Sequence, residues 1–242
     1  MNPPEAKHEF VGRRTLLAHL ERSYRRQRHV LLHGPAGAGK SALMAEFARS
    51  HRMLPAPACN SLGVLLEALE PAAGLNGEEL RMAGRVHRLA SRLPQIGRPI
   101  VVDNVARVPP RVAHLLRVLM IRQPVWLLVR SVAPIDLGHV WPYLYLFERI
   151  DLAPFSLEET RAFLAAADFP GNRRELLDSA LRLHRLAAGH PGTLAALVAE
   201  MRHRAYNLRT AEGLRLLALH ARITSVVRQI APNDALEDLA VL

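Results

Sequence analysis

Eight consecutive residues have the types and spacing that bind a phosphate group. They match the pattern G-x-x-x-x-G-K-[ST] and read Gly34-Pro35-Ala36-Gly37-Ala38-Gly39-Lys40-Ser41. Glycines let backbone N–H groups approach phosphate oxygens, and a helix that starts at Lys40 and includes Ala42 adds free amides and a positive dipole end. Lys40 would reach the β- and γ-phosphates, and the Ser41 hydroxyl would bind Mg²⁺. The run predicts a site for ATP or ADP with Mg²⁺; the alternative is a simple glycine-rich turn.

A carboxylate ends an apolar run further along the chain. Asp103 follows Ile100, Val101 and Val102, and sites of this class place such a carboxylate near Mg²⁺. The alternative is that Asp103 only caps the next turn. Many hydrolases carry an acid directly after this aspartate as the base for the attacking water. Here the next residue is Asn104, whose amide can orient water but cannot accept its proton. We therefore expect hydrolysis that is slow, or that occurs only inside an assembly.

Alternating strands and helices must position these residues. Continuous apolar strands separated by helices predict an α/β fold with a parallel sheet covered on both faces, which binds ligands at the carboxyl ends of its strands. We expect strands at 29–33, 53–60, 98–104, 124–130 and 149–152, and helices at 13–28, 40–49, 62–69, 78–93, 110–122 and 139–147.

The pattern changes to helices only after Pro154. Ser156 and Glu159 have the spacing of an N-cap and its capping-box partner. Further helices are expected at 173–188, 193–205 and 211–242. The chain therefore divides into an α/β nucleotide-binding domain at 1–153, a small helical domain at 154–210 and a helical tail at 211–242.

Composition limits the function classes. The chain has 242 residues, half of them hydrophobic, so it is not a disordered chain. One cysteine excludes an internal disulfide and a four-cysteine zinc site, and the scattered histidines indicate no metal other than Mg²⁺. The first twenty residues lack the apolar run of a signal peptide, and no stretch of about 18 apolar residues exists. We expect a cytoplasmic protein without a membrane partner.

Arginine far outnumbers lysine among the basic residues. Of the 32 Lys and Arg residues only Lys7 and Lys40 are lysine, so position 40 keeps a compact ammonium against a bias toward arginine. The formal net charge is +10. A basic cluster at 22–28 could bind nucleic-acid phosphates, or it could be the solvated face of a helix.

In their order, these motifs resemble a nucleotide-binding module of the AAA+ superfamily, especially its STAND-like branch. The resemblance covers roughly residues 9–202. It implies a P-loop NTPase core followed by a helical lid. The matching segments are the entry motif at 9–13, Walker A at 34–41, a Walker B without glutamate at 101–105, sensor 1 at 126–131, the junction to the lid at 150–156 and the G-x-P element at 189–192.

The resemblance also implies residue roles. Val11 and Gly12 of the entry motif would line the adenine pocket. Pro191 would lie close to the nucleotide, unless it is a simple helix breaker. Thr193 stands where many lids present a sensor-2 arginine, which, like Asn104, puts fast autonomous hydrolysis in doubt.

Two arginines are candidates for sensing or stabilising the transferred phosphate. Arg130 or Ser131 would sense the γ-phosphate at the end of the sensor strand; the alternative for Arg130 is an ordinary solvated side chain. Arg149 lies where related proteins present an arginine finger to the neighbouring subunit; the alternative is an ion pair with Glu148 or Asp151.

Three functions follow from the resemblance. The first is an ATP-dependent switch that closes its lid and assembles into a homo-oligomeric ring or filament. The second is a regulator of transposition or replication-initiation type that oligomerises on duplex DNA, in which the ATPase ring itself contacts DNA because no helix-turn-helix follows the lid. The third is an interaction module that holds nucleotide as a structural ligand and docks a protein client.

Overall fold

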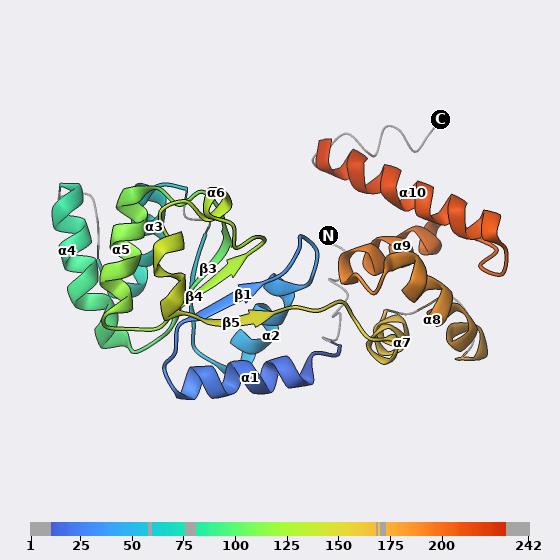
Figure 1. Ribbon diagram of the computed structural model, residues 1–242, viewed down its shortest axis with the longest axis horizontal. Coiled ribbons are helices and arrows are strands. Elements are labelled where there is room, and N and C mark those ends of the chain that lie inside the picture. Colours follow the sequence, from blue (N-terminus) through green and yellow to red (C-terminus); the bar gives the residue numbers. More distant parts are fainter. Residues whose placement is uncertain (1–10, 58–59, 76–80, 168, 170–172, 231–242) are drawn as a thin grey trace, which may run out of the picture. The chain divides into compact units, whose positions relative to one another are not determined.

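The computed structural model describes residues 11–57, 60–75, 81–167, 169 and 173–230 (Figure 1). The chain folds into two compact units. One is Arg13–Ala153, called here the α/β unit. The other begins at Pro154 and includes Gly12, and is called here the helical unit.

A five-stranded parallel sheet forms the centre of the α/β unit. The strand order is β2-β3-β4-β1-β5, and every neighbouring pair is parallel. The predicted α/β fold with a parallel sheet is therefore confirmed. The strands are β1 (Val30–His33), β2 (Leu54–Ala56), β3 (Ile100–Val105), β4 (Val125–Val129) and β5 (Glu148–Asp151).

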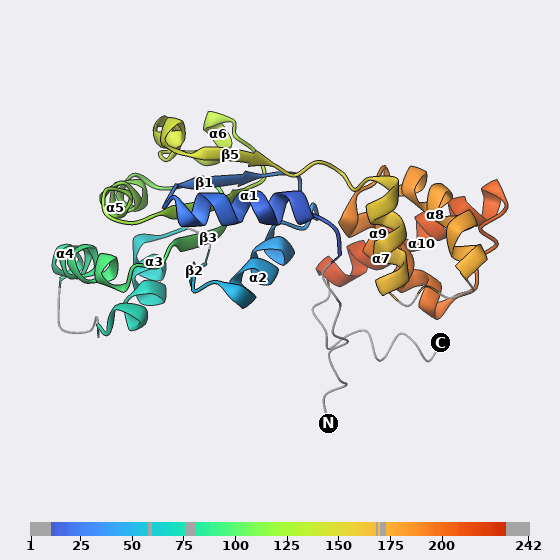
Figure 2. The ribbon, with the colours of Figure 1, turned by 90° about the horizontal axis from the view of Figure 1, so that it is seen from below.

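Helices cover both faces of this sheet. Helices α1 (Arg14–Arg25) and α2 (Lys40–Ser50) lie on one face, where the ring of Phe47 packs 5.4 Å from that of Trp126 in β4. Figure 2 shows these two helices in front of the sheet. The opposite face carries α3 (Leu62–Leu69), α4 (Met82–Arg92) and α5 (Pro110–Met120), whose leucines share one buried core with the strands.

Some elements differ from the sequence-based expectations. Strand β2 has only three residues: Pro55 lies within it, as an edge strand allows, and Pro57 directly follows its last residue. The expected helix at 139–147 is instead a 3₁₀ segment, η4 (Trp141–Leu146), preceded by a short helix α6 (Pro134–Leu137) that the sequence did not predict. Two more 3₁₀ turns, η1 (Pro71–Ala73) and η3 (Leu93–Ile96), follow α3 and α4.

The helical unit contains α7 (Leu157–Ala166), α8 (Arg173–Ala187), α9 (Pro191–His203) and α10 (Ala211–Ile230). Ser156 caps α7, and the reciprocal capping box with Glu159 is present as predicted. Leucines 164, 183, 197 and 217 form its buried core. The expected helical tail at 211–242 is observed as far as Ile230; its remainder lies outside the described residues. Within the described chain, no helix has the length and apolar character needed to cross a bilayer.

Candidate functional site

The run from Gly34 to Ser41 forms the turn between β1 and α2. Gly37 and Gly39 have φ of 74° and 90°, the left-handed conformation that glycine adopts without steric cost. A Cβ on Gly34 would lie 3.1 Å from the Cβ of Leu152 and 3.3 Å from that of Ala38. Backbone conformation therefore favours glycine at positions 37 and 39, and close packing favours it at position 34.

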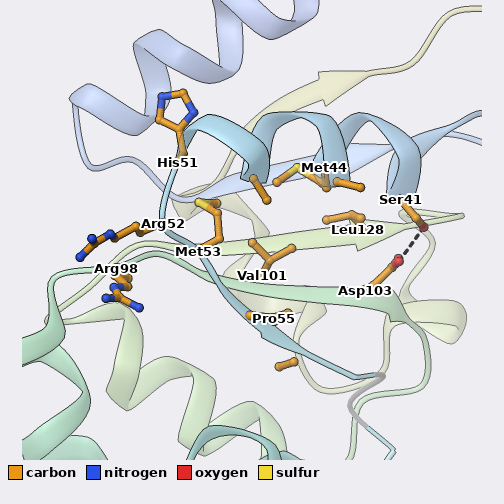
Figure 3. A pocket seen from close by; sticks show the side chains of 13 residues that line it. Ser41, Met44, His51, Arg52, Met53, Pro55, Arg98, Val101, Asp103 and Leu128 are labelled. Atoms are coloured by element: carbon orange, nitrogen blue, oxygen red, sulfur yellow. Dashed lines mark hydrogen bonds between the residues drawn. The ribbon is translucent and has the colours of Figure 1, made fainter. Parts of the chain in front are cut away.

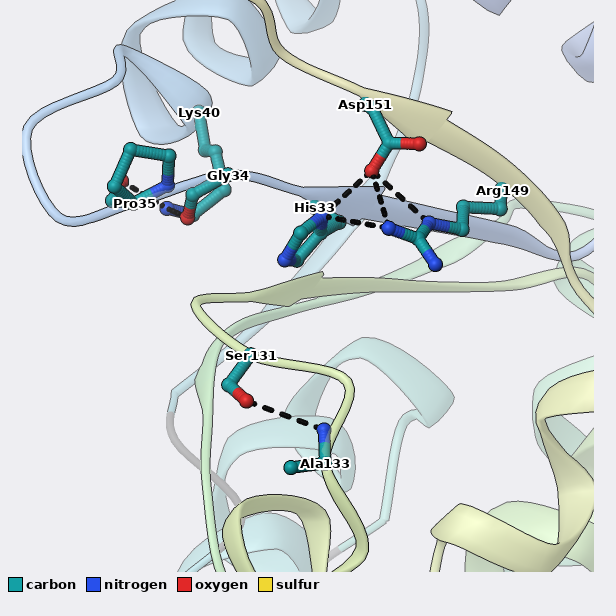
Figure 4. Close-up of polar contacts among 8 residues, drawn as sticks. All are labelled: His33, Gly34, Pro35, Lys40, Ser131, Ala133, Arg149 and Asp151. Atoms are coloured by element: carbon teal, nitrogen blue, oxygen red, sulfur yellow. Dashed lines mark hydrogen bonds and ion pairs between the residues drawn. The ribbon is translucent and has the colours of Figure 1, made fainter.

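Lys40 is the first residue of α2, and its side chain turns back over the loop. Its ammonium group donates hydrogen bonds to the carbonyl oxygens of Gly34, at 2.6 Å, and Pro35, at 2.9 Å (Figure 4). The side chain is largely buried. Burial lowers the pKa of Lys40 below its ordinary value, the positive charge of Arg130 lowers it further, and Asp103 opposes the shift.

The first turn of α2 adds an anion-attracting end. Gly39 is the N-cap, so the amides of Lys40, Ser41 and Ala42 have no partner within the helix. The helix dipole places a partial positive charge at the same point. Loop, ammonium and helix terminus thus converge where a phosphate group would be stabilised.

Ser41 and Asp103 come together beside this loop. The Ser41 hydroxyl donates a hydrogen bond of 2.6 Å to a carboxylate oxygen of Asp103 (Figure 3). These are the oxygen ligands that Mg²⁺ uses together with phosphate and water. In the described ranges, no cluster of three or more His, Cys, Asp or Glu residues could hold a metal ion alone. The pair fits a cation that takes its other ligands from a bound nucleotide.

Asn104 occupies an unexpected backbone conformation. Its φ is 52°, and the β3–β4 register shifts between Val102 and Val105. Its N–H donates a 2.6 Å hydrogen bond to Asp103 Oδ1. Asparagine tolerates the left-handed region better than most residues. The bulge therefore exposes the Asn104 side chain and fixes the orientation of the Asp103 carboxylate.

Arg130 and Ser131 follow β4 and have different surroundings. The charge of Arg130 is near enough to Lys40 to affect its pKa, and the Arg130 side chain is exposed. The Ser131 hydroxyl accepts a 3.1 Å hydrogen bond from the N–H of Ala133, which stabilises the turn after the strand. Of the two candidates, Arg130 is the one whose charge acts on the loop lysine.

Arg149 lies in an ion pair on β5. Its guanidinium contacts Asp151 at 2.8 and 2.9 Å and lies 3.2 Å from Nδ1 of His33 (Figure 4). His33 Nδ1 is also 2.6 Å from Asp151. The hydrogen bond with Arg149 is the largest cause that lowers the pKa of Asp151, and the hydrogen bond with His33 lowers this pKa further. The ion-pair alternative is the arrangement observed within one chain, and the role in a neighbouring subunit stays a prediction.

Sequence reasoning missed His33, and it included Arg13 in the entry motif without a role of its own. His33 directly precedes Gly34, and its position at the end of β1 was the available signal. Arg13 is buried and donates hydrogen bonds to the carbonyl oxygens of Ala153, at 2.6 Å, and Ala38, at 3.4 Å. Arg13 thus joins the phosphate loop to the end of the α/β unit, 140 residues away in the chain.

The remaining predicted site residues belong to the helical unit. Gly12 has φ of 78°, and a Cβ there would lie 3.0 Å from Oε1 of Glu159. Pro191 is the first residue of α9, a position that proline favours. Val11 precedes Gly12 and is half-buried. The assignment of these three residues to an adenine pocket stays a prediction.

Comparison with known proteins agrees with this geometry. The family model for the AAA ATPase domain matches residues 9–129, half of the chain. The chain belongs to the AAA ATPase domain family. None of the curated proteins matches the sequence of this AAA ATPase significantly. The predicted membership of the AAA+ superfamily is confirmed.

Solved structures share the fold of this AAA ATPase at low identity. A Walker-type ATPase of Pyrococcus abyssi superposes with a TM-score of 0.62 at 15% identity, covering 95% of this chain and 78% of its own. The Orc1 protein of Aeropyrum pernix, solved in complex with DNA, superposes with a TM-score of 0.60 at 18% identity. The match covers 95% of this chain and 71% of the Orc1 chain. A STAND protein of Pyrococcus horikoshii superposes with a TM-score of 0.50 at 20% identity. The match covers 79% of this chain and 30% of the STAND protein.

Proposed function

We propose that this AAA ATPase is a molecular switch that binds Mg·ATP, closes a helical lid and assembles into a homo-oligomeric ring or filament. The nucleotide-binding domain is residues 1–153, the lid 154–210 and the tail 211–242, which docks a protein client. The observation that carries the proposal is the convergence of the Lys40 ammonium, the start of α2 and the Ser41–Asp103 pair at one edge of the sheet.

Each group has one task in this proposal. Lys40 exchanges its hydrogen bonds to Gly34 and Pro35 for oxygens of the β- and γ-phosphates. Ser41 and Asp103 hold Mg²⁺. Arg130, whose charge already acts on Lys40, senses the γ-phosphate.

Hydrolysis in this proposal is slow without a neighbour. The exposed Asn104 orients water but accepts no proton. Arg149 would stabilise transition-state charge on a neighbour's nucleotide only after leaving Asp151, its present partner. Breaking an exposed ion pair costs about 1 kcal/mol or less, so assembly could supply that energy.

Nucleotide binding by purified protein tests the proposal. We expect Mg·ATP and Mg·ADP to bind the wild type, and Lys40→Ala to abolish both. Arg49→Ala is a matched control, because Arg49 lies in the same helix and pairs with Glu46 at its other end. Mass measured with ADP, with ATP and with a slowly hydrolysed analogue should rise only with the triphosphates. Equal affinity in Lys40→Ala would contradict the proposal.

A second candidate is the assembly of this switch on duplex DNA. The net charge of +10 favours it, since phosphate contacts dominate non-specific affinity. One structural neighbour was solved with DNA. Gel shifts at rising salt, with and without ATP, test it. Retardation that requires ATP and weakens with salt would support this candidate, and no binding at about 50 mM salt would remove it.

A further inference from the structure

An apolar trough of about 510 Å³ runs beside α2 on the sheet face that α1 and α2 cover (Figure 3). Its volume lies within the range of small-molecule sites, about 300–1,000 Å³. Side chains of α2, of the strands and of the segment between α2 and β2 form its walls. They are Met44, Ala45, Ala48, Met53, Val101 and Leu128.

The two ends of the trough differ in charge. One end is formed by Ser41 and Asp103, at the carboxyl end of β3. The other is formed by Arg52 and Arg98, and Figure 3 shows both arginines at that end. Arg98 lies two residues before β3 and Asp103 lies within it, and five extended steps between them span about 16 Å.

Arg52 and Arg98 are available to a ligand. Within the part of the chain that the structure describes, no hydrogen bond or ion pair engages either guanidinium group. His51 also lines this end, but it is held by a 2.6 Å contact with Glu21 and stacks on Phe47. Two arginines beside an apolar wall form a binding group for a single carboxylate with an apolar body.

We propose that the trough binds an aliphatic monocarboxylate of medium chain length, with its carboxylate on Arg52 and Arg98. The chain then lies along α2 toward Ser41. Met44 and Met53 favour an aliphatic body, because methionine side chains adapt to flexible apolar groups. The span of about 16 Å between the two ends limits the ligand to a chain of medium length.

The position of the trough couples such a ligand to the nucleotide site. Ser41 and Asp103 belong both to the trough and to the pair that holds Mg²⁺ in the proposed function, on which this coupling rests. A chain that reaches them alters the affinity for Mg·nucleotide, and Mg·nucleotide alters the affinity for the carboxylate by the same factor. The carboxylate would therefore be a regulatory ligand.

Calorimetric titration with decanoate, below its micellar concentration and without nucleotide, tests the binding. The double variant Arg52→Gln/Arg98→Gln should weaken it about tenfold or more, since charge-assisted hydrogen bonds are lost. Ala48→Trp, which places a large ring in the trough from an exposed helix position, should abolish it. Arg49→Gln changes the same charge outside the trough and should bind as the wild type does. Decanol, which lacks the charge, should bind more weakly.

The outcomes separate this proposal from the proposed function. Lys40→Ala should lose nucleotide and keep decanoate, because Lys40 does not line the trough; the double arginine variant should do the reverse. Absence of decanoate binding, or equal binding by Ala48→Trp, overturns the proposal. The proposal is also overturned if the protein forms a dimer without decanoate and Ala48→Trp makes it monomeric, because a second copy of the chain would then occupy the trough.

Discussion

The Ser41 hydroxyl lies 2.6 Å from the Asp103 carboxylate, although 62 residues separate them in the chain. The sheet order explains the distance. Strand β3 is separated from β1 only by β4, and α2 leaves the end of β1 on its way toward β2 at the sheet edge. The start of α2 therefore passes the carboxyl end of β3, which is where parallel sheets of this kind bind ligands.

Ser41→Ala should remove the contribution of Mg²⁺ to nucleotide affinity. The hydroxyl is one of two protein oxygens offered to the cation, so its loss should weaken Mg·ADP about tenfold and leave ADP in EDTA unchanged. Titration with and without Mg²⁺ measures both values. Ser50→Ala, at the exposed other end of α2, is the control and should match the wild type. A loss of equal size in EDTA would mean that Ser41 acts on the phosphate and not on Mg²⁺.

Asn104 should respond to substitution in two separable ways. Asn104→Glu supplies a base for the attacking water and should raise ATP turnover, but a glutamate at φ of 52° should cost about 1–2 kcal/mol of stability. Asn104→Gly should relieve the strain and add no base. ATPase rates and urea unfolding of both variants test this. Unchanged turnover in Asn104→Glu would show that the missing acid does not limit hydrolysis.

The contributions of local sequence and of tertiary structure can be separated at this site. The loop from Gly34 to Ser41 was predictable because its glycines and lysine are adjacent in the chain and their chemistry is local. The parallel sheet was predictable because its strands are continuously apolar. Asp103 was predictable from its place at the end of such a strand.

Other features depend on contacts that no local pattern encodes. Arg13 bonds to Ala153 across 140 residues, and His33 meets Asp151 across 118. The bulge at Asn104 depends on pairing between β3 and β4. An exposed ion pair was an alternative for Arg149, but its choice of Asp151 over Glu148 follows from strand geometry, since residues two apart share a face.

As pH rises, the affinity for ADP should begin to fall at a lower pH than it would if Lys40 had the pKa of an ordinary lysine. Burial and the charge of Arg130 lower the pKa of Lys40, so its positive charge is lost sooner as pH rises. Arg130→Gln removes one lowering cause and should move this basic limb to higher pH. Fluorescence titration of ADP in EDTA from pH 8 upward measures it. An identical limb in Arg130→Gln would contradict the coupling between the two cations.

Arg13→Met should loosen the phosphate loop. Methionine keeps the length of the side chain but leaves the carbonyl oxygens of Ala153 and Ala38 without their donor. The bond to Ala38 is buried, and an unsatisfied buried carbonyl costs about 1–3 kcal/mol, so both stability and ADP affinity should fall. Arg14→Met, at the adjacent exposed position, is the control. Calorimetric unfolding and ADP titration measure the two effects; a stability loss with unchanged ADP affinity would separate Arg13 from the loop.

Tyr206→Phe should destabilise the helical unit and change its response to pH. The Tyr206 hydroxyl donates a 2.8 Å hydrogen bond to the buried Glu200, which also accepts one from Thr224 of α10. Burial raises the pKa of Glu200, but these bonds outweigh it and the net pKa is lowered. The ionised Glu200 therefore stabilises the folded state at pH values above 4.5, its ordinary pKa. This contribution is lost as pH falls through the lowered pKa of the folded state.

Removing the Tyr206 hydroxyl weakens that contribution, so Tyr206→Phe should lose about 1–3 kcal/mol at pH 7 and less in acid, where Glu200 is protonated. Burial and the hydrogen bond to Glu200 also raise the pKa of Tyr206 to about 12, so the wild type should keep this interaction well above pH 10. Urea unfolding at pH 7, at pH 10 and at pH values lowered stepwise from 4 measures the three regimes. Tyr145→Phe, at an exposed position in η4, is the matched control. A loss that stays constant as pH falls from 7 through the lowered pKa of Glu200 would mean that the tyrosine acts through packing and not through the glutamate.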